Sequence, residues 1–514
     1  METEIKKTPF YSQKLDDKYS ILGRSIGIDT QTQSLSTRTI ESSNLISGDL
    51  NGQQLTFSFT VSPSAYIDWN NCNMEIGFVF KKAGEDAPAT KVSIPWNLLL
   101  FIFEEIKVQF NGTTVFNKVA GEYLETQTFK LLTEYTNADL NNSEIVFAPV
   151  GDYNYNVDLI GAYEFTNAGK DTSSDDPNGL IRFQNWISPM VGSQIKVLYK
   201  RPTFKDLFFS MPGFSKNLRN VNIVVKIKEK IPLAKLIDTG SGIMVVKSMK
   251  LQLHEYNFSP SAAISALNNK INGEDEHLSF IDVNKQERVY SPYITVTNQE
   301  NVQWVAAVQF CHNVTSIIPT IEAGSQNKGK AEYQNCGQFL LMNGYATKGA
   351  DADNDGADGT KKGDATIKNL IHRSDLPPTT NANLPVKGSP CYNPMSSIQA
   401  QYGSITYPSN AIDTQVDDNP TLLKTDELYA EYRKAVGFNN PAVPEDIFRR
   451  TMPFFMVKFT PNIKLIQSGD IIIRMPGFSG ENNAATKKIS IIYGQLKSYN
   501  ISPSGIVSET ISSY

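Results

Sequence analysis

Several short phrases occur twice in the chain, in the same order. The nine residues Leu253–Ser261 (LHEYNFSPS) return as Leu496–Ser504 (LKSYNISPS), and Met211–Ser215 (MPGFS) returns as Met475–Ser479. Two further pairs are weaker: Tyr199–Lys205 with Lys458–Lys464, and Ile106–Gly112 with Ile398–Gly403. The separation between copies changes from 292 positions for the Ile106 and Ile398 pair to 243 for Tyr256 and Tyr499. Repeats that keep their order while their separation drifts indicate a tandem duplication of one domain, with loops of different length.

Short apolar or alternating runs separated by Gly, Pro, Asn and Asp dominate both halves. This pattern predicts an antiparallel β-sandwich or barrel. The expected strands cover residues 55–61, 74–80, 106–110, 221–227, 249–253, 293–296, 302–310, 454–459, 471–473 and 489–493. Two helices are expected, over 122–133 and 426–436. Thr425 precedes the second as its N-cap and Gly437 ends it.

The repeat and the composition of the connecting segments divide the chain. We expect an extended arm over 1–45, a first domain over 46–262, a linker over 263–289 and a second domain over 290–514. Two long insertions, 148–180 and 324–394, are expected to be surface loops on a shared scaffold, because long structureless loops are uncommon inside compact domains.

Charge and targeting signals exclude several classes of function. The net charge is −5, and the first fifty residues carry six basic against seven acidic side chains, so no arm for binding a genome is expected. The opening residues show no signal peptide. The most apolar run, 94–103, is about half of the ~20 residues that a membrane-spanning helix requires. The four cysteines (Cys72, Cys311, Cys336 and Cys391) have no paired spacing, which fits a reducing compartment without structural zinc.

No arrangement of residues predicts an enzyme. The run Gly324–Lys330 resembles the start of a phosphate-binding loop, but Ala331 stands where Ser or Thr would hold Mg²⁺. Glu104-Glu105 and Cys311-His312 are neighbours on expected strands, so each pair points to opposite faces. The four histidines lack metal-ligand spacing. The Pro-Gly of each MPGFS copy instead favours a type II turn that Phe214 or Phe478 anchors. We therefore expect no catalytic and no cofactor-binding residue.

One acidic loop is a candidate metal site. Asp351, Asp353, Asp355 and Gly356 match the first half of an EF-hand loop, with oxygen ligands at positions 1, 3 and 5. Lys362 occupies position 12, where an EF-hand has a bidentate Glu. A solvated acidic loop is therefore the favoured interpretation, and a weakly bound Ca²⁺ at these three aspartates is the alternative.

These features together resemble the double jelly-roll major capsid proteins of adenovirus-like, virophage and polinton-like viruses. The resemblance rests on two tandem β-rich halves of about 250 residues, each with a strand, a Gly turn and a helix: Ile106–Gly112 before 122–133, and Ile398–Gly403 before 426–436. Large-virus members often carry two glycines after that strand. Here Asn111-Gly112 and a lone Gly403 stand there, which favours a virophage or polinton-like relative of the mavirus type.

The resemblance implies an all-β fold of two eight-stranded jelly rolls with a few short helices and long surface loops. It also implies a structural, non-enzymatic protein that forms homotrimeric, pseudo-hexagonal capsomers of an icosahedral DNA virus. Its expected partners are itself, neighbouring capsomers and minor capsid or penton proteins, with no sequence-specific nucleic acid and no transmembrane segment. Its expected location is the virion capsid, assembled in the host cell. Proteolytic trimming at Tyr514 is left open. The alternative is a tandem β-sandwich that binds carbohydrate, such as an adhesin or viral attachment protein.

Overall fold

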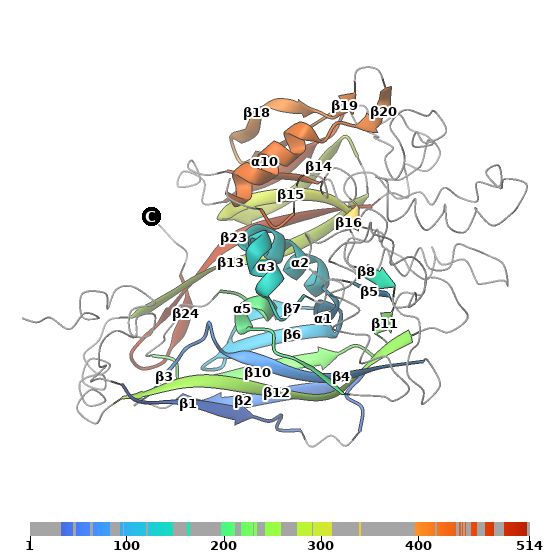
Figure 1. The fold of residues 1–514 in the computed structure, drawn as a ribbon. Helices are drawn as coiled ribbons and strands as arrows, with labels where there is room; N and C mark the ends of the chain where they lie inside the picture. Colours follow the sequence, from blue (N-terminus) through green and yellow to red (C-terminus); the bar gives the residue numbers. More distant parts are fainter. Residues whose placement is uncertain are drawn as a thin grey trace, which may run out of the picture.

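The fold is taken from a computed structural model of the 514-residue chain. The structure describes these ranges: 32–44, 48–61, 65–82, 93–95, 97–119, 122–146, 162–164, 197–210, 217–229, 231–233, 242–258, 275–289, 291–310, 339–340, 396–416, 419–437, 441–443, 445, 448, 454–459, 468–476 and 488–510. Four antiparallel sheets carry most of this part of the chain, two from each half (Figure 1).

The first half forms one sandwich of two sheets. The larger sheet has the order β1 (Thr32–Ile40), β12 (Gly242–Phe258), β4 (Asn73–Lys82), β9 (Leu198–Lys200), with β3 (Ala65–Ile67) and β11 (Pro232–Leu233) also on β12. The smaller sheet has the order β2 (Gln54–Thr60), β10 (Asn220–Ile227), β6 (Phe103–Phe110), β7 (Thr113–Lys118). Buried and part-exposed residues alternate along β10, as expected of a strand with one face on the core.

The second half repeats this arrangement. Its larger sheet has the order β13 (Glu276–Val289), β23 (Lys488–Ile501), β15 (Val302–Phe310), with β16 (Phe339–Leu340) and β21 (Phe455–Lys458) on β15 and β24 (Val507–Glu509) on β23. Its smaller sheet has the order β14 (Tyr293–Glu300), β22 (Ser468–Arg474), β17 (Ser397–Tyr402), β18 (Ile405–Asp413). Two strand pairs lie outside the sandwiches: β5 (Ser93–Pro95) with β8 (Ala162–Glu164), and β19 (Gln415–Val416) with β20 (Asn419–Leu423).

The two sandwiches match strand for strand. Eight strands of the first sandwich have a counterpart in the second, and corresponding strands have the same neighbours. In chain order the pairs are β1 and β13, β2 and β14, β4 and β15, β6 and β17, β7 and β18, β9 and β21, β10 and β22, and β12 and β23. The fold is therefore all-β, with two eight-stranded jelly rolls in tandem, as the sequence predicts. The ten expected strands all fall within these elements, to within one residue at either end.

Helices connect corresponding strands in both halves. In the first half they are α1 (Leu98–Phe101), α2 (Glu122–Glu134), α3 (Asn137–Asn142) and α5 (Phe204–Leu207); in the second half, α10 (Asp426–Val436) follows β18 as α2 follows β7. The expected helices at 122–133 and 426–436 are confirmed. Thr425 does precede α10, but its side chain makes no capping hydrogen bond. Gly437 ends the helix with φ of 99°, a conformation that favours glycine.

The structure differs from the expected division of the chain at two places. Within the expected arm 1–45, β1 pairs with β12 along its length and is the edge strand of the first jelly roll. Within the expected linker 263–289, β13 pairs with β23 through fourteen residues. Much of β1 faces solvent, and one side of β13 carries charged groups, so both strands are polar. They therefore lack the alternation of apolar residues from which strands are predicted.

The repeated MPGFS phrase does not mark equivalent positions. Met211 follows α5 and precedes β10, whereas Met475 directly follows β22, which is the counterpart of β10. In chain order, the first copy thus precedes its strand and the second copy follows the corresponding one. The phrase around Tyr256 and Tyr499 does mark equivalent positions. Tyr256 pairs with Leu35 of β1, and Tyr499 pairs with Leu278 of β13. The two tyrosines are 243 positions apart in the chain, and so are the two leucines. Phe214 and Phe478 lie outside the described residues.

Candidate functional site: the contact between the two jelly rolls

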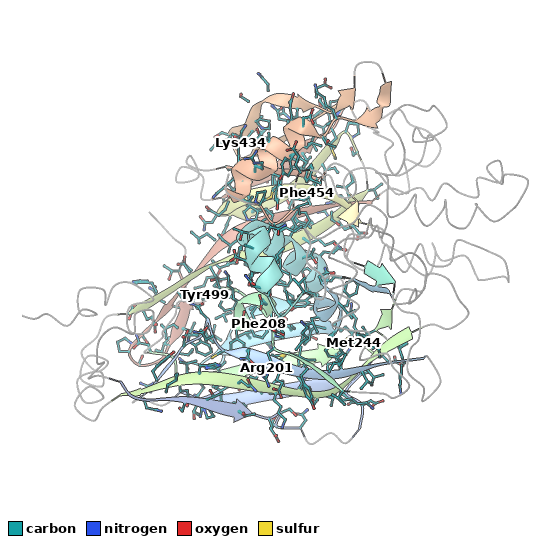
Figure 2. The ribbon with its side chains drawn as sticks, viewed as in Figure 1. Arg201, Phe208, Met244, Lys434, Phe454 and Tyr499 are labelled. Atoms are coloured by element: carbon teal, nitrogen blue, oxygen red, sulfur yellow. The ribbon has the colours of Figure 1, made fainter. Side chains whose placement is uncertain are left out.

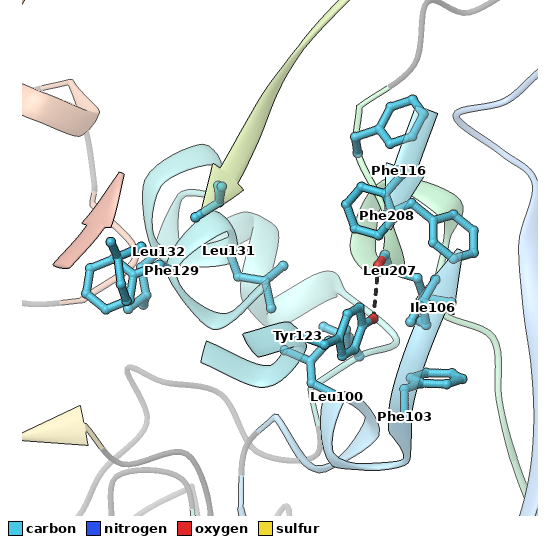
Figure 3. Close-up of a cluster of buried hydrophobic side chains, with 14 of the residues drawn as sticks. Leu100, Phe103, Ile106, Phe116, Tyr123, Phe129, Leu131, Leu132, Leu207 and Phe208 are labelled. Atoms are coloured by element: carbon cyan, nitrogen blue, oxygen red, sulfur yellow. Dashed lines mark hydrogen bonds between the residues drawn. The ribbon is translucent and has the colours of Figure 1, made fainter. Parts of the chain in front are cut away.

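Helix α2 belongs to the first jelly roll and lies between the two sandwiches (Figure 1). Seven consecutive residues, Thr126–Leu132, are buried, although three of them are Thr or Gln and one is Lys130. Tyr123 faces the first jelly roll and donates a hydrogen bond from its hydroxyl to the Leu207 carbonyl at 2.9 Å (Figure 3). A surface helix would expose one side, so α2 is covered by both sandwiches.

The other side of α2 packs on aromatic rings of the second jelly roll. Phe129 lies with its ring centroid 6.5 Å from Trp304 of β15 and 5.3 Å from Phe454, just before β21. In Figure 3, Phe129 and Leu132 point away from the side that holds Tyr123. The backbone carbonyl of Leu132 accepts a hydrogen bond of 2.9 Å from the Tyr432 hydroxyl of α10. The helix therefore joins two apolar cores into one.

A stack of three aromatic rings forms a second apolar contact. Phe280 of β13 lies parallel to Phe209 of the first jelly roll, with centroids 3.9 Å apart and planes at 14°. Tyr499 of β23 also lies nearly parallel to Phe280, with ring centroids 6.0 Å apart and planes at 14°. Figure 2 shows Tyr499 in the space between the two sandwiches. Its hydroxyl donates to the Val115 carbonyl at 3.4 Å, so the ring also carries a polar link.

Lys118, at the end of β7, is the centre of a buried polar cluster. Its side chain is 2% exposed, and its Nζ lies 3.0 Å from Asp282 Oδ1 and donates to Asn284 Oδ1 at 2.7 Å. Glu122 of α2 adds a carboxylate at 3.7 Å. Because Asp282 and Asn284 both belong to β13, the lysine links the two jelly rolls through one ion pair and one hydrogen bond. A buried charge requires such partners.

Glu125 of α2 makes the second charged link. Its Oε2 lies 2.5 Å from Lys285 Nζ of β13, and the Ser490 hydroxyl of β23 donates to the same oxygen at 3.4 Å. Burial raises the pKa of Glu125 to about 7, while the charge of Lys285 acts in the opposite direction. Burial thus has the larger effect, and Glu125 titrates near neutral pH at the contact between the sandwiches.

The turn between β6 and β7 contacts the end of the Leu496–Ser504 phrase of the second jelly roll and the Gly505 that follows it. Asn111 has a left-handed φ of 47°, and its Nδ2 donates to the Gly505 carbonyl at 2.7 Å. Its Oδ1 accepts from the backbone N–H of Arg219 and of Asn220 at 2.9 and 2.8 Å, which holds the turn in place. Arg219 also donates from its guanidinium to the Pro503 carbonyl at 3.0 Å. The end of this phrase and the Gly505 that follows it therefore dock on the first jelly roll.

These contacts run from the β6–β7 turn to the far end of α2, so they fix the relative position of the two sandwiches. Sequence reasoning missed Lys118, Glu125 and Lys285, because each appears as an ordinary surface charge on its own element. Lys118 and Asn284 are 166 positions apart, and no local pattern relates them.

The residues singled out from the sequence for chemistry remain separate where they are described. Glu104 forms an ion pair of 3.0 Å with Lys226 of β10. Among the described residues, no three His, Cys, Asp or Glu side chains are placed to hold a metal ion. The candidate calcium ligands Asp351, Asp353 and Asp355, the loop 324–330 and Cys311-His312 lie outside the described residues, so the calcium site stays a prediction. No helix in the described ranges is long and apolar enough to cross a bilayer.

Comparison with known proteins gives matches in structure alone. The sequence matches no protein-family model and no curated protein. The fold is similar to a chain of the Sputnik virophage structure (TM-score 0.47, 8% identity, 96% of this chain and 91% of that one). It is also similar to the mavirus major capsid protein (0.43, 11%, 100% and 97%) and to the Faustovirus major capsid protein (0.44, 8%, 93% and 92%).

Proposed function

We propose that this chain is a structural building block of a viral capsid and forms homotrimeric capsomers of an icosahedral DNA virus. The observation that carries the proposal is the duplication: two jelly rolls with the same strand order, held together as one unit. Three such chains in a closed ring present six similar walls, so a threefold assembly acquires a nearly hexagonal outline. A closed ring with threefold symmetry requires one head-to-tail contact, repeated three times.

The contact between the sandwiches supports this role. It buries an ionic cluster, a stack of aromatic rings and the middle of helix α2, and such a contact resists relative movement of the two domains. A lattice subunit requires that rigidity, because each wall must meet its neighbour at a fixed angle. Divergent loops between equal frameworks also fit tiling, since only the walls must match. Under this proposal the protein has a structural, non-enzymatic role and is located in the virion capsid after assembly in the host cell.

Further partners follow from a capsid lattice. Neighbouring capsomers would contact the outer walls, and minor capsid or penton proteins would fill the gaps at vertices. The weak Ca²⁺ site at Asp351, Asp353 and Asp355 belongs to this proposal as an optional surface feature.

The carbohydrate-binding alternative gains no support from the tryptophans. Sugar platforms require exposed aromatic faces, but Trp69 and Trp304 are 2% and 6% exposed and serve the core and the jelly-roll contact. Trp96 and Trp186 lie outside the residues with described side chains.

Electron microscopy of the purified protein tests the proposed function. Particles with a pseudo-hexagonal outline and threefold symmetry are expected. Isolated two-lobed particles at every concentration, together with binding on a glycan array, would favour the tandem carbohydrate-binding protein instead.

A further inference from the structure

Lys118 has a neutral amide as its nearest polar contact in the buried cluster. Its Nζ donates a hydrogen bond of 2.7 Å to Asn284 Oδ1, whereas the carboxylates of Asp282 and Glu122 lie at 3.0 and 3.7 Å. The lysine comes from the end of β7 and the asparagine from β13, 166 positions away. An amine in contact with an amide carbonyl, with a carboxylate beside the amine, has the groups needed to form a new amide bond.

The carbon atom of this amide is within reach of the amine. Asn284 Cγ is one carbonyl bond, about 1.23 Å, from Oδ1, so Nζ lies at most about 4 Å from Cγ. Reacting atoms at about 3–3.5 Å are in position to react. The lysine side chain is flexible, so a small rotation closes the remaining distance.

Asn284 is held with its carbonyl toward the lysine. Its Nδ2 donates to Gln495 Oε1 of β23 at 2.8 Å, and Gln495 in turn donates from Nε2 to the Glu300 carbonyl at 3.0 Å. Because a lysine ammonium has only donors, the amide cannot turn over without losing both of its bonds. Gln495 is only partly buried, so the amide nitrogen points toward a route to solvent.

Asp282 is placed to take a proton from the lysine. It lies two residues before Asn284, so both side chains belong to the same face of β13. Its Oδ1 is 3.0 Å from Lys118 Nζ, is buried, and accepts no hydrogen bond from the residues that the structure describes. No hydrogen bond therefore competes for this oxygen, and it can receive the proton that Nζ must lose before it acts as a nucleophile.

The surroundings of the cluster exclude water. The Lys118 side chain is 2% exposed, and its Nζ lies 5.8 Å from the centroid of the Phe116 ring. Phe116 packs against Phe209, which stacks on Phe280 of β13, so aromatic rings cover this side of the contact. Exclusion of water strengthens the electrostatic interactions of the reacting groups and suppresses hydrolysis.

We propose that Lys118 and Asn284 form an isopeptide bond that joins the two jelly rolls covalently. Nζ gives one proton to Asp282, and its lone pair adds to Asn284 Cγ to form the new C–N bond. A second proton passes from Nζ to Nδ2, the Cγ–Nδ2 bond breaks, and the nitrogen leaves as ammonia. Ammonia takes up the proton held by Asp282, so the carboxylate is restored. A protonated amine and a primary amide thus become a secondary amide and an ammonium ion, without any oxidant or reductant.

The bond goes beyond the proposed function, because it forms within one copy of the chain and does not depend on assembly. It connects positions 118 and 284, so the two jelly rolls stay joined even when the chain unfolds. Closing a long loop in this way also lowers the conformational entropy of the unfolded chain, which favours the folded state.

Mass spectrometry of the denatured full-length protein tests the bond. The wild type is expected to be lighter than its sequence mass by one molecule of ammonia. Trypsin does not cleave after a modified lysine, so digestion should also yield peptide 108–130 joined to peptide 271–285. A succinimide at an Asn-Gly pair such as Asn111-Gly112 also loses ammonia, but it joins no two peptides. A wild-type protein with the full sequence mass and separate peptides overturns the proposal, whether or not the protein assembles.

Three variants assign the reacting groups. Lys118→Met removes the amine and is expected to have its full sequence mass. Asp282→Asn keeps both reacting groups but removes the proton acceptor, so the joined fraction should fall by about tenfold or more. Lys285→Met is the matched control, since Lys285 also links the jelly rolls, through Glu125, but takes no part in the reaction; it should still lack one ammonia. A joined product in Lys118→Met, or an unchanged joined fraction in Asp282→Asn, overturns the assignment.

Discussion

Replacing Glu125 by Gln is predicted to change how the free energy of unfolding depends on pH. Burial raises the pKa of Glu125 from 4.5 to about 7 in the folded chain. Because the native state then binds the proton more tightly than the unfolded state, the stability that Glu125 contributes is complete below pH 4.5. It is lost as the pH rises through about 7.

The size of the effect follows from the two pKa values. The interval from 4.5 to about 7 corresponds to about 3 kcal/mol, at about 1.36 kcal/mol for each pH unit. Glu125→Gln lacks this titration, so its free energy of unfolding is expected to rise by about 3 kcal/mol relative to wild type between pH 4.5 and pH 8. A pH-independent cost of replacing the carboxyl by an amide, such as altered packing, shifts all points equally and cancels in this comparison.

Urea unfolding at a series of pH values measures the difference, with tryptophan fluorescence as the probe because Trp304 packs against Phe129 at the contact. Lys285→Gln is the companion variant: it removes the charge that lowers the pKa of Glu125, so the pH midpoint should move upward. A difference between Glu125→Gln and wild type that stays constant from pH 4.5 to pH 8 would refute the reasoning.

Three further substitutions test the contact between the sandwiches. Phe280→Ala removes the ring stacked on Phe209 and should lower the free energy of unfolding by about 3–5 kcal/mol; a loss below about 1 kcal/mol in urea unfolding would contradict the stack. Gly494→Ala places a Cβ 2.3 Å from Trp304 Nε1, so it should lower the free energy of unfolding by about 1–3 kcal/mol and shift the tryptophan emission. An unchanged emission spectrum would contradict this close approach. Asn111→Ala loses the turn's side-chain hydrogen bonds and should cost about 1–3 kcal/mol by thermal or urea unfolding, whereas wild-type stability would show that the turn is not a docking element.

The sequence predicted the strands whose apolar alternation reflects one buried face. β2 and β10 are examples. The helix at 426–436 was found from its boundary residues, and the helix at 122–133 from its place after the repeated strand and Gly turn. It did not predict β1 or β13 as strands. β1 is an edge strand with Leu35 and its neighbours toward solvent, and β13 carries Asp282 and Lys285 toward the other jelly roll, so their patterns reflect an interface and not a core.

The repeat predicted the two-domain fold correctly, but only one of the two longer phrases marks equivalent positions in the two domains. The phrase around Tyr256 and Tyr499 marks the same place in both sheets, because both tyrosines pair with an edge-strand leucine. The MPGFS phrase was misleading, since similar turn chemistry suits several connections in one sandwich. The buried charges Lys118 and Glu125 could not be found from sequence, because their burial depends on the second jelly roll.

The mass of the purified protein in solution tests the central claim most directly. Light scattering coupled to size exclusion should give about three times the chain mass of 57.1 kDa, with little free monomer on dilution. A particle of one chain mass that persists when the protein is concentrated would contradict the proposal that two joined jelly rolls are the wall of a closed, threefold capsomer.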